Sequence, residues 1–94
     1  MTSVKHIFRA HALRWMFQRR IAIEEVRQVL ATGETIESYP QDDPYPSRLV
    51  LGWRANRPLH VVVADNRKAE EIIIITVYEP DPALWDTDFK RRKS

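Results

Sequence analysis

Two histidines stand inside stretches that predict regular structure, and their side chains could transfer protons. His11 falls in the sequence HALRWM and His60 falls in PLHVVV. An imidazole titrates near neutral pH, so it can accept a proton from a ribose hydroxyl or donate one to a leaving oxygen. Tyr78 is a third candidate, as a proton-positioning group. The competing interpretation is that each imidazole is buried and hydrogen-bonded to the backbone or to a neighbour such as Tyr78.

Arginine and tyrosine side chains supply a second kind of candidate site, one that binds nucleic acid. An arginine can hold a phosphate group, and a tyrosine can stack on a base. The candidate nucleic-acid-binding residues are Arg14, Arg20, Arg48 and Tyr39. The alternative is that the arginines form a solvated rim, while the aromatic side chains fill the core or brace the proline-rich loop.

The sequence contains no pattern that is typical of metal or cofactor chemistry. His6 and His11 are five residues apart, so a helix would not place them on one face as a metal site requires. Asp42 and Asp43 are adjacent acids in a proline-rich loop, where carboxylates are usually solvated. There is no glycine-rich phosphate loop, His-Glu-x-x-His motif or nucleophile elbow, so we predict neither a metal site nor a cofactor.

Length and composition predict one small globular domain. The 94 residues carry 15 Lys and Arg against 13 Asp and Glu, a formal net charge of +2, which permits nucleic-acid binding without demanding it. We expect a single domain over residues 1–94 that ends in a basic tail at about residues 90–94. Because the chain has no cysteine and no long apolar run, we expect a cytoplasmic protein that does not enter a membrane.

A β-hairpin is the centre of the predicted fold. Leu59–Ala64 and Ile72–Tyr78 are rich in β-branched residues and are separated by a short polar break. Ser47–Arg54 shows the same strand pattern, and Glu34–Tyr39 is an edge-like strand that Pro40 ends. Because apolar residues occupy both alternating faces of the hairpin, we expect its strands to be central in the sheet.

Two helices precede the strands in this prediction. Apolar residues repeat at helical spacing from Val4 to Arg19, but the first of them are β-branched or aromatic, so the helix could begin only near Arg9. A second helix is predicted over Ile23–Ala31, with Gly33 as a left-handed C-terminal cap. The sequence therefore predicts an α+β fold in which a two-helix hairpin packs on an antiparallel sheet of three to four strands.

Four segments of the chain resemble the short bacterial proteins of the domain of unknown function 4258 family. They are HALRWMFQRRIAIEEVRQVLATGE, IESYPQDDPYPSRLVLGW, RPLHVVVAD and ITVYEPDPALW, and together they cover most of the chain from about His11 onward. That family is similar to small plasmid-type toxins of the RelE, ParE and BrnT kind. The resemblance implies a RelE-like fold, a metal-independent endoribonuclease activity and an antitoxin protein as partner.

Two functions remain open. The first is an RNA-cleaving or RNA-binding toxin component, with His11, His60 and Tyr78 as catalytic candidates around one shared pocket. The second is a non-catalytic module that binds a partner protein or a second copy of itself. Association is favoured because two helices cover only one face of a sheet whose two faces are both apolar. The other face then needs the C-terminal segment around Trp85, a homodimer or an antitoxin-like partner.

Overall fold

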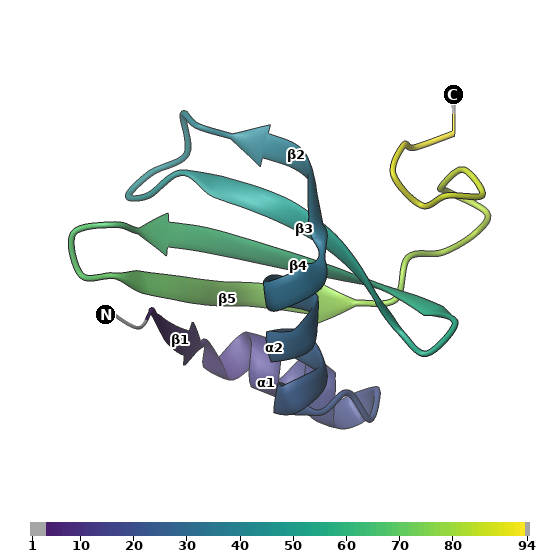
Figure 1. The fold of residues 1–94 in the computed structure, drawn as a ribbon, viewed down its shortest axis with the longest axis horizontal. Coiled ribbons are helices and arrows are strands. Elements are labelled where there is room, and N and C mark those ends of the chain that lie inside the picture. Colours follow the sequence, from purple (N-terminus) through teal and green to yellow (C-terminus); the bar gives the residue numbers. More distant parts are fainter. Residues whose placement is uncertain (1–3, 94) are drawn as a thin grey trace.

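The computed structural model describes residues 4–93, which form a five-stranded sheet with two helices on one face (Figure 1). The strands lie in the order β1-β5-β4-β3-β2. The elements are β1 Lys5–Phe8, α1 Ala10–Gln18, α2 Ile23–Thr32, β2 Glu34–Tyr39, β3 Ser47–Arg54, β4 Arg57–Asn66 and β5 Glu71–Tyr78. The predicted α+β class is confirmed, and so is the antiparallel pairing of β3 with β4 and of β4 with β5.

The first strand is the main departure from the predicted fold. The sequence predicts three to four antiparallel strands, whereas the sheet has five and one pairing is parallel. β1 runs beside β5 from Lys5, opposite Glu71, to Phe8, opposite Ile74, and α1 begins only at Ala10. The β-branched and aromatic residues of this segment suit a strand, and β5 offers an unpaired edge to it. As a result β5 is a central strand between β1 and β4.

The turn between the helices is closed by backbone hydrogen bonds. Arg20 has a left-handed backbone with φ of 57°, and the N–H of Ile21 donates to the carbonyl of Met16 at 2.8 Å. This bond satisfies one of the free carbonyl groups at the end of α1. The Glu25 carboxylate then accepts the N–H of Ala22 at 2.8 Å, which caps the start of α2.

One face of the sheet and the inner sides of both helices form a continuous apolar core. The helices contribute residues three or four apart, and β4 contributes alternate residues. In β5 a shift in the pairing with β4 separates the core residues Ile74 and Val77 by three positions. The core residues are Ala12, Met16, Ile21, Val26, Val29, Val50, Leu59, Val61, Val63, Ile74 and Val77. The residues between them on the strands point to the opposite face, which we call the second face.

Two glycines allow α2 to lie close to β3. Gly33 does not form the predicted left-handed cap, because its φ is −79° and its backbone is extended. Gly33 instead allows close packing, since a Cβ atom there would collide with the carbonyl oxygens of Val29 and Leu51. A Cβ atom on Gly52 would lie 2.7 Å from both γ-methyl groups of Val29. The helix therefore packs directly against the backbone of β3.

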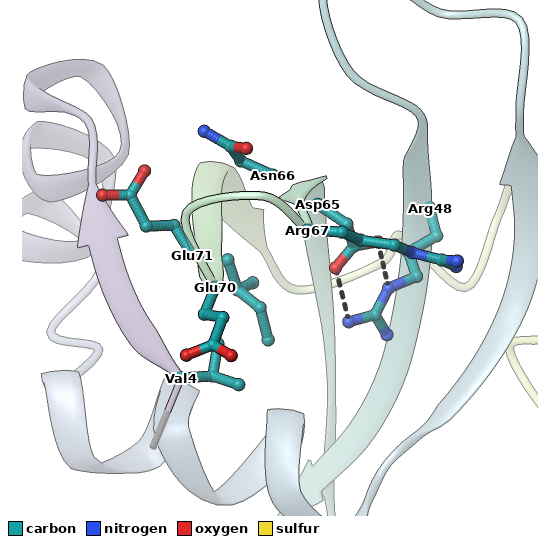
Figure 2. Close-up of a pocket in the computed structure, with 8 residues that line it drawn as sticks. Val4, Arg48, Asp65, Asn66, Arg67, Glu70 and Glu71 are labelled. Atoms are coloured by element: carbon teal, nitrogen blue, oxygen red, sulfur yellow. Dashed lines mark hydrogen bonds and ion pairs between the residues drawn. The ribbon is translucent and has the colours of Figure 1, made fainter. Parts of the chain in front are cut away.

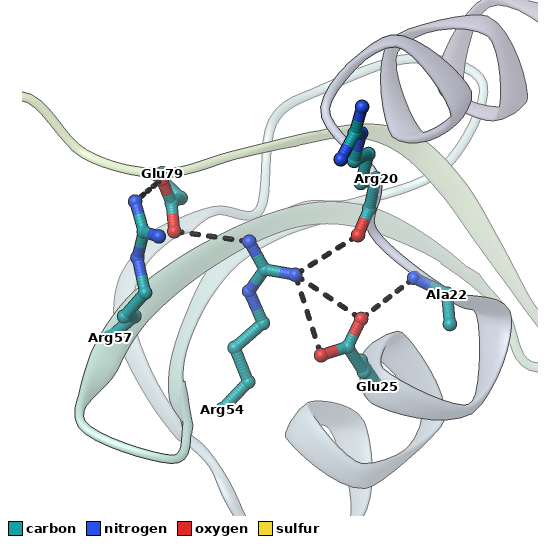
Figure 3. A network of polar contacts seen from close by, with 6 residues as sticks. All are labelled: Arg20, Ala22, Glu25, Arg54, Arg57 and Glu79. Atoms are coloured by element: carbon teal, nitrogen blue, oxygen red, sulfur yellow. Dashed lines mark hydrogen bonds and ion pairs between the residues drawn. The ribbon is translucent and has the colours of Figure 1, made fainter.

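An arginine network joins α2, the β3–β4 turn and the end of β5 (Figure 3). Nη1 of Arg54 lies 3.2 Å from Oε1 of Glu25 and 3.2 Å from the carbonyl oxygen of Arg20. Nη2 of the same guanidinium lies 3.1 Å from Glu79, which also binds Arg57 at 2.8 Å. Because one partly buried guanidinium bridges two carboxylates, it fixes the start of α2 relative to the sheet.

Replacing Gly52 by alanine should destabilise the fold. We expect Gly52→Ala to lower the free energy of unfolding by about 1–3 kcal/mol, because the added methyl group overpacks the contact between α2 and β3. Urea denaturation of the wild type and the variant measures the change. In the double variant with Val29→Ala, the combined loss should be smaller than the sum of the single losses, because the nearest methyl groups are gone. Strictly additive losses would contradict the close contact.

Candidate functional site on the second face of the sheet

His60 lies at the centre of the second face. Its side chain is fully buried, and on the neighbouring strands it stands opposite Leu51 and Tyr78. Its Nε2 lies 2.9 Å from the carbonyl oxygen of Phe89, and its Nδ1 lies 3.2 Å from the Tyr78 hydroxyl. Since a carbonyl oxygen can only accept, Nε2 carries the proton and Nδ1 of the neutral ring accepts from Tyr78. Burial lowers the pKa of His60, although the hydrogen bond to the Phe89 carbonyl opposes this effect.

The end of the chain, residues 80–93, follows β5 as an irregular segment that we call the C-terminal strap (Figure 1). It contacts this histidine through the Phe89 carbonyl and the Trp85 ring. Trp85 is only 3% exposed, and its ring packs edge-on against His60 with centroids 4.5 Å apart. The ring of Phe89 meets Trp53 of β3 at a centroid distance of 6.0 Å. The strap is therefore held by aromatic contacts as well as by the hydrogen bond from His60 to its backbone.

The basic end of the strap is attached to the body of the protein. The sequence predicts a solvated tail here, and the side chains of Lys90 to Lys93 are indeed exposed. However, Lys90 forms an ion pair with Glu34 at 3.0 Å, and the guanidinium of Arg92 lies 5.0 Å from the centroid of Trp85. An isolated backbone bridge also joins Trp85 to Arg92. These contacts attach the side chains of Lys90 and Arg92 to the body of the protein.

Glu37, Tyr39 and Arg92 extend the His60–Tyr78 pair into a polar cluster. The Tyr39 hydroxyl donates to the Glu37 carboxylate, and this bond, together with desolvation, raises the pKa of Tyr39. Burial raises the pKa of Tyr78, so this phenol keeps its proton at neutral pH. The charges of Glu37 and Arg92 act on all three titrating rings. We call these five residues the second-face cluster.

The second-face cluster includes three of the residues that the sequence singles out. They are His60, Tyr78 and Tyr39. His11 lies elsewhere: it is exposed on α1, and its Nε2 accepts a hydrogen bond from Nε1 of Trp15 at 2.7 Å. The neighbouring Ala12, together with Met16, is turned by α1 into the core on the other side of the sheet. The shared pocket of His11 and His60 is therefore not formed.

The predicted phosphate-binding arginines also lie outside the second-face cluster. Arg48 donates to both carboxylate oxygens of Asp65, at 2.9 and 3.2 Å, beside a hollow of about 410 Å³ (Figure 2). The Asp65 carboxylate neutralises the charge of Arg48. Arg48 also points to the helix side of the sheet, because it is two residues from the core residue Val50 on the same strand. Arg14 and Arg20 are exposed on and beside α1.

Sequence patterns did not single out Glu37 and Arg92, for different reasons. The pairing of β2 with β3 shifts between Thr35 and Glu37, so simple alternation along the whole strand does not apply. The spacing of Glu37 and Tyr39 by two residues was nevertheless an available signal for a shared face. Arg92 stands in a run of four basic residues, Lys90 to Lys93, in which no pattern distinguishes one from another.

The described part of the chain shows neither a metal-binding geometry nor a membrane-spanning helix. Within residues 4–93, no three or more His, Asp or Glu side chains are grouped so that they could hold a metal ion. The helices of the same range are too short and too polar to cross a bilayer.

A protein-family model matches most of the chain. Residues 8–79 match the family described as Domain of unknown function (DUF4258). The chain belongs to this family. The DUF4258 match includes both helices, strands β2 to β5 and four members of the second-face cluster, whereas Arg92 and the C-terminal strap lie beyond it. No curated protein and no solved structure matches the chain.

The buried His60 should make stability depend on pH. Its pKa in the folded protein is below the unfolded value of 6.5, so the unfolded chain binds more protons as the pH falls. The free energy of unfolding should therefore be highest above pH 6.5 and should fall as the pH drops below that value. Urea denaturation on both sides of this pH measures the slope, and His60→Gln should flatten it.

His6 provides the matched control for this measurement. Burial, and secondarily the charge of Arg27, lowers the pKa of His6 as well, so it contributes a slope of the same sign. Because His6 is only partly buried whereas His60 is fully buried, His6→Gln should leave most of the slope in place. A slope that survives His60→Gln unchanged would show that His60 is not held neutral.

Proposed function

We propose that this protein binds RNA at the second-face cluster and cleaves it without a metal ion, in the manner of a toxin-like endoribonuclease. The observation that supports this most is that the charges of a carboxylate and of a guanidinium both act on one protonated phenol. These groups belong to Glu37, Tyr78 and Arg92. An acid, a base and a phosphate-binding cation are the groups that metal-independent RNA cleavage requires.

Each group suits one part of the reaction. The Glu37 carboxylate takes the proton of a ribose 2′-hydroxyl, whose oxygen then bonds to the adjacent phosphorus. Arg92 binds the phosphate and stabilises the negative charge that develops there. The bond from phosphorus to the 5′-oxygen breaks, and the Tyr78 hydroxyl turns its proton from Nδ1 of His60 to that leaving oxygen and protonates it. The products are a 2′,3′-cyclic phosphate and a 5′-hydroxyl end.

In this proposal His60 is a positioning residue. Trp85 covers its ring and the Phe89 carbonyl occupies its Nε2, so the imidazole does not touch a substrate. Its Nδ1 holds the Tyr78 hydroxyl and keeps the phenol at the cluster. Tyr39 is 41% exposed at the edge of the cluster, where its ring can stack on a base.

The predicted likeness to toxins of the RelE, ParE and BrnT kind supports the RNA proposal through the resemblance of sequence motifs. The likeness itself stays a prediction, and so do the antitoxin-like partner, the homodimer and the cytoplasmic location. The argument for a homodimer is that an apolar face of the sheet needs to be covered. The C-terminal strap covers part of this second face and buries Trp85 there, which weakens that argument.

A second candidate function is a non-catalytic interaction module. It is favoured by the state of His60, whose two nitrogens are both hydrogen-bonded within the chain and whose ring is buried. In that case the imidazole holds the C-terminal strap in place and the second-face cluster has no substrate.

An RNA-cleavage assay with end-labelled transcripts, with and without ribosomes and in the presence of EDTA, tests the enzyme proposal. We expect the wild type to form 2′,3′-cyclic phosphate ends. Glu37→Gln and Tyr78→Phe should each slow cleavage by about 10²- to 10⁴-fold, because each removes a proton-transfer group. Glu24→Gln, which changes an exposed acid at the start of α2, should cleave at the wild-type rate.

Melting curves of the same variants separate lost chemistry from lost folding, since a variant with a wild-type melting temperature is still folded. Wild-type protein that cleaves no RNA under any of these conditions, and does not slow growth when it is expressed alone, would reject the enzyme. The interaction module would then be the better account.

A further inference from the structure

A concave apolar surface lies along α1 and the segment that leads to α2. It forms a hollow of about 540 Å³ whose floor is made by Met16 and Ile21, which are 2% and 5% exposed. Its walls include Leu13, Phe17 and Ile23, which are 40%, 87% and 36% exposed. We call this surface the α1 hollow.

The apolar side chains of the α1 hollow are neighbours and not scattered single residues. Leu13 and Phe17 are four residues apart on α1, so they share one side of the helix, and Ile23 lies across the turn from them. Single exposed apolar residues are common on soluble proteins, but a contiguous apolar concavity is typical of a binding site. Phe17 in particular presents almost its whole ring to solvent.

The surroundings of the α1 hollow are positively charged. The first 23 residues of the chain contain no Asp or Glu. They contain the basic residues Lys5, Arg9, Arg14, Arg19 and Arg20, and all of these are exposed. The acids nearest in sequence are Glu24 and Glu25, and Arg54 already binds Glu25. Arg14 lines the hollow and Arg20 directly precedes its floor residue Ile21, so an occupant meets apolar walls with exposed arginines at the rim.

We propose that the α1 hollow docks an amphipathic helix of a partner protein, with an acidic polar face. Apolar residues of such a helix, spaced at i, i+3 or i+4, and i+7, would cover Leu13, Phe17 and Ile23. Its carboxylates would lie against Arg14 and Arg20 at the rim. The α1 hollow and the second-face cluster lie on opposite sides of the sheet, so this inference stands whether or not the protein cleaves RNA.

The chemistry of the α1 hollow favours this occupant over three others. A symmetric contact with a second copy would bring the same arginines against each other, and like charges disfavour it. RNA would neutralise the arginines but would leave the aliphatic walls against a polar backbone. A lipid surface would not fill the recessed floor at Met16 and Ile21, and α1 is only nine residues long.

A display selection on the full-length protein tests this inference without presupposing one ligand sequence. Random peptides of about 16 residues, long enough for about four helical turns, are selected on the wild type and depleted on Phe17→Asp. We expect the enriched peptides to be acidic and to carry apolar residues at helical spacing. A synthetic copy of an enriched peptide should bind Phe17→Asp and Arg14→Glu at least about tenfold more weakly than wild type.

Two further variants control for folding and for nonspecific binding of the peptide to exposed apolar side chains. Phe17→Ser removes the ring without adding a charge, and since Phe17 is 87% exposed its melting temperature should match that of the wild type while peptide binding is still lost. Leu84→Ala truncates an apolar side chain of the C-terminal strap that is 56% exposed, and it should bind the peptide as the wild type does.

Three results would overturn the proposal. The first is that no peptide is enriched, or that the enriched peptides are neutral or basic. The second is a concentration-dependent dimer in sedimentation that Phe17→Asp dissolves, because a second copy then occupies the α1 hollow. The third is binding of oligouridine or of phosphatidylglycerol vesicles that Phe17→Asp abolishes and that the acidic peptide does not displace.

Discussion

The buried imidazole of His60 is the constraint on which the second face depends. A polar ring inside an apolar sheet destabilises the fold unless both of its nitrogens are hydrogen-bonded. One partner is the Tyr78 hydroxyl on the adjacent strand, and the other is the carbonyl of Phe89 in the C-terminal strap. Satisfying this single side chain therefore positions Tyr78 within the second-face cluster and draws the end of the chain back over the sheet.

The C-terminal strap covers part of the sheet face that the helices leave open. Both faces of the central strands are apolar, and the helices bury only one of them. On the other face Trp85 packs on His60, and Arg92 is carried to the same place by its contact with Trp85. On the helix side, the α1 hollow is an apolar surface that stays open, and it is the surface at which we propose an interaction with another protein.

The central part of the fold could be predicted from the sequence because local patterns determine it. Strands β3, β4 and β5 have dense β-branched residues and short turns, and α2 has an apolar stripe with acids in its first turn. β1 depends on a long-range contact, because a four-residue segment becomes a strand only where β5 offers it an edge. The extended backbone at Gly33 depends likewise on how closely α2 approaches β3.

The site was less predictable because it is assembled from segments that are distant in sequence. His60 and Tyr78 come from one hairpin, so their pairing could be anticipated. The placement of His11 depends on which side of α1 packs inward, and Ala12 and Met16 take that side. The position of Arg92 follows from the folding back of the strap, which no local pattern of a basic tail reveals.

Nuclear magnetic resonance of the histidine side chains tests the role of His60 most directly. With ¹⁵N-labelled histidine at pH 7, we expect the His60 ring to be neutral with its proton on Nε2, and its ring protons to show nuclear Overhauser effects to the indole of Trp85. A His60 ring that titrates at the ordinary pKa of an exposed histidine, with no such effects to Trp85, would contradict the account.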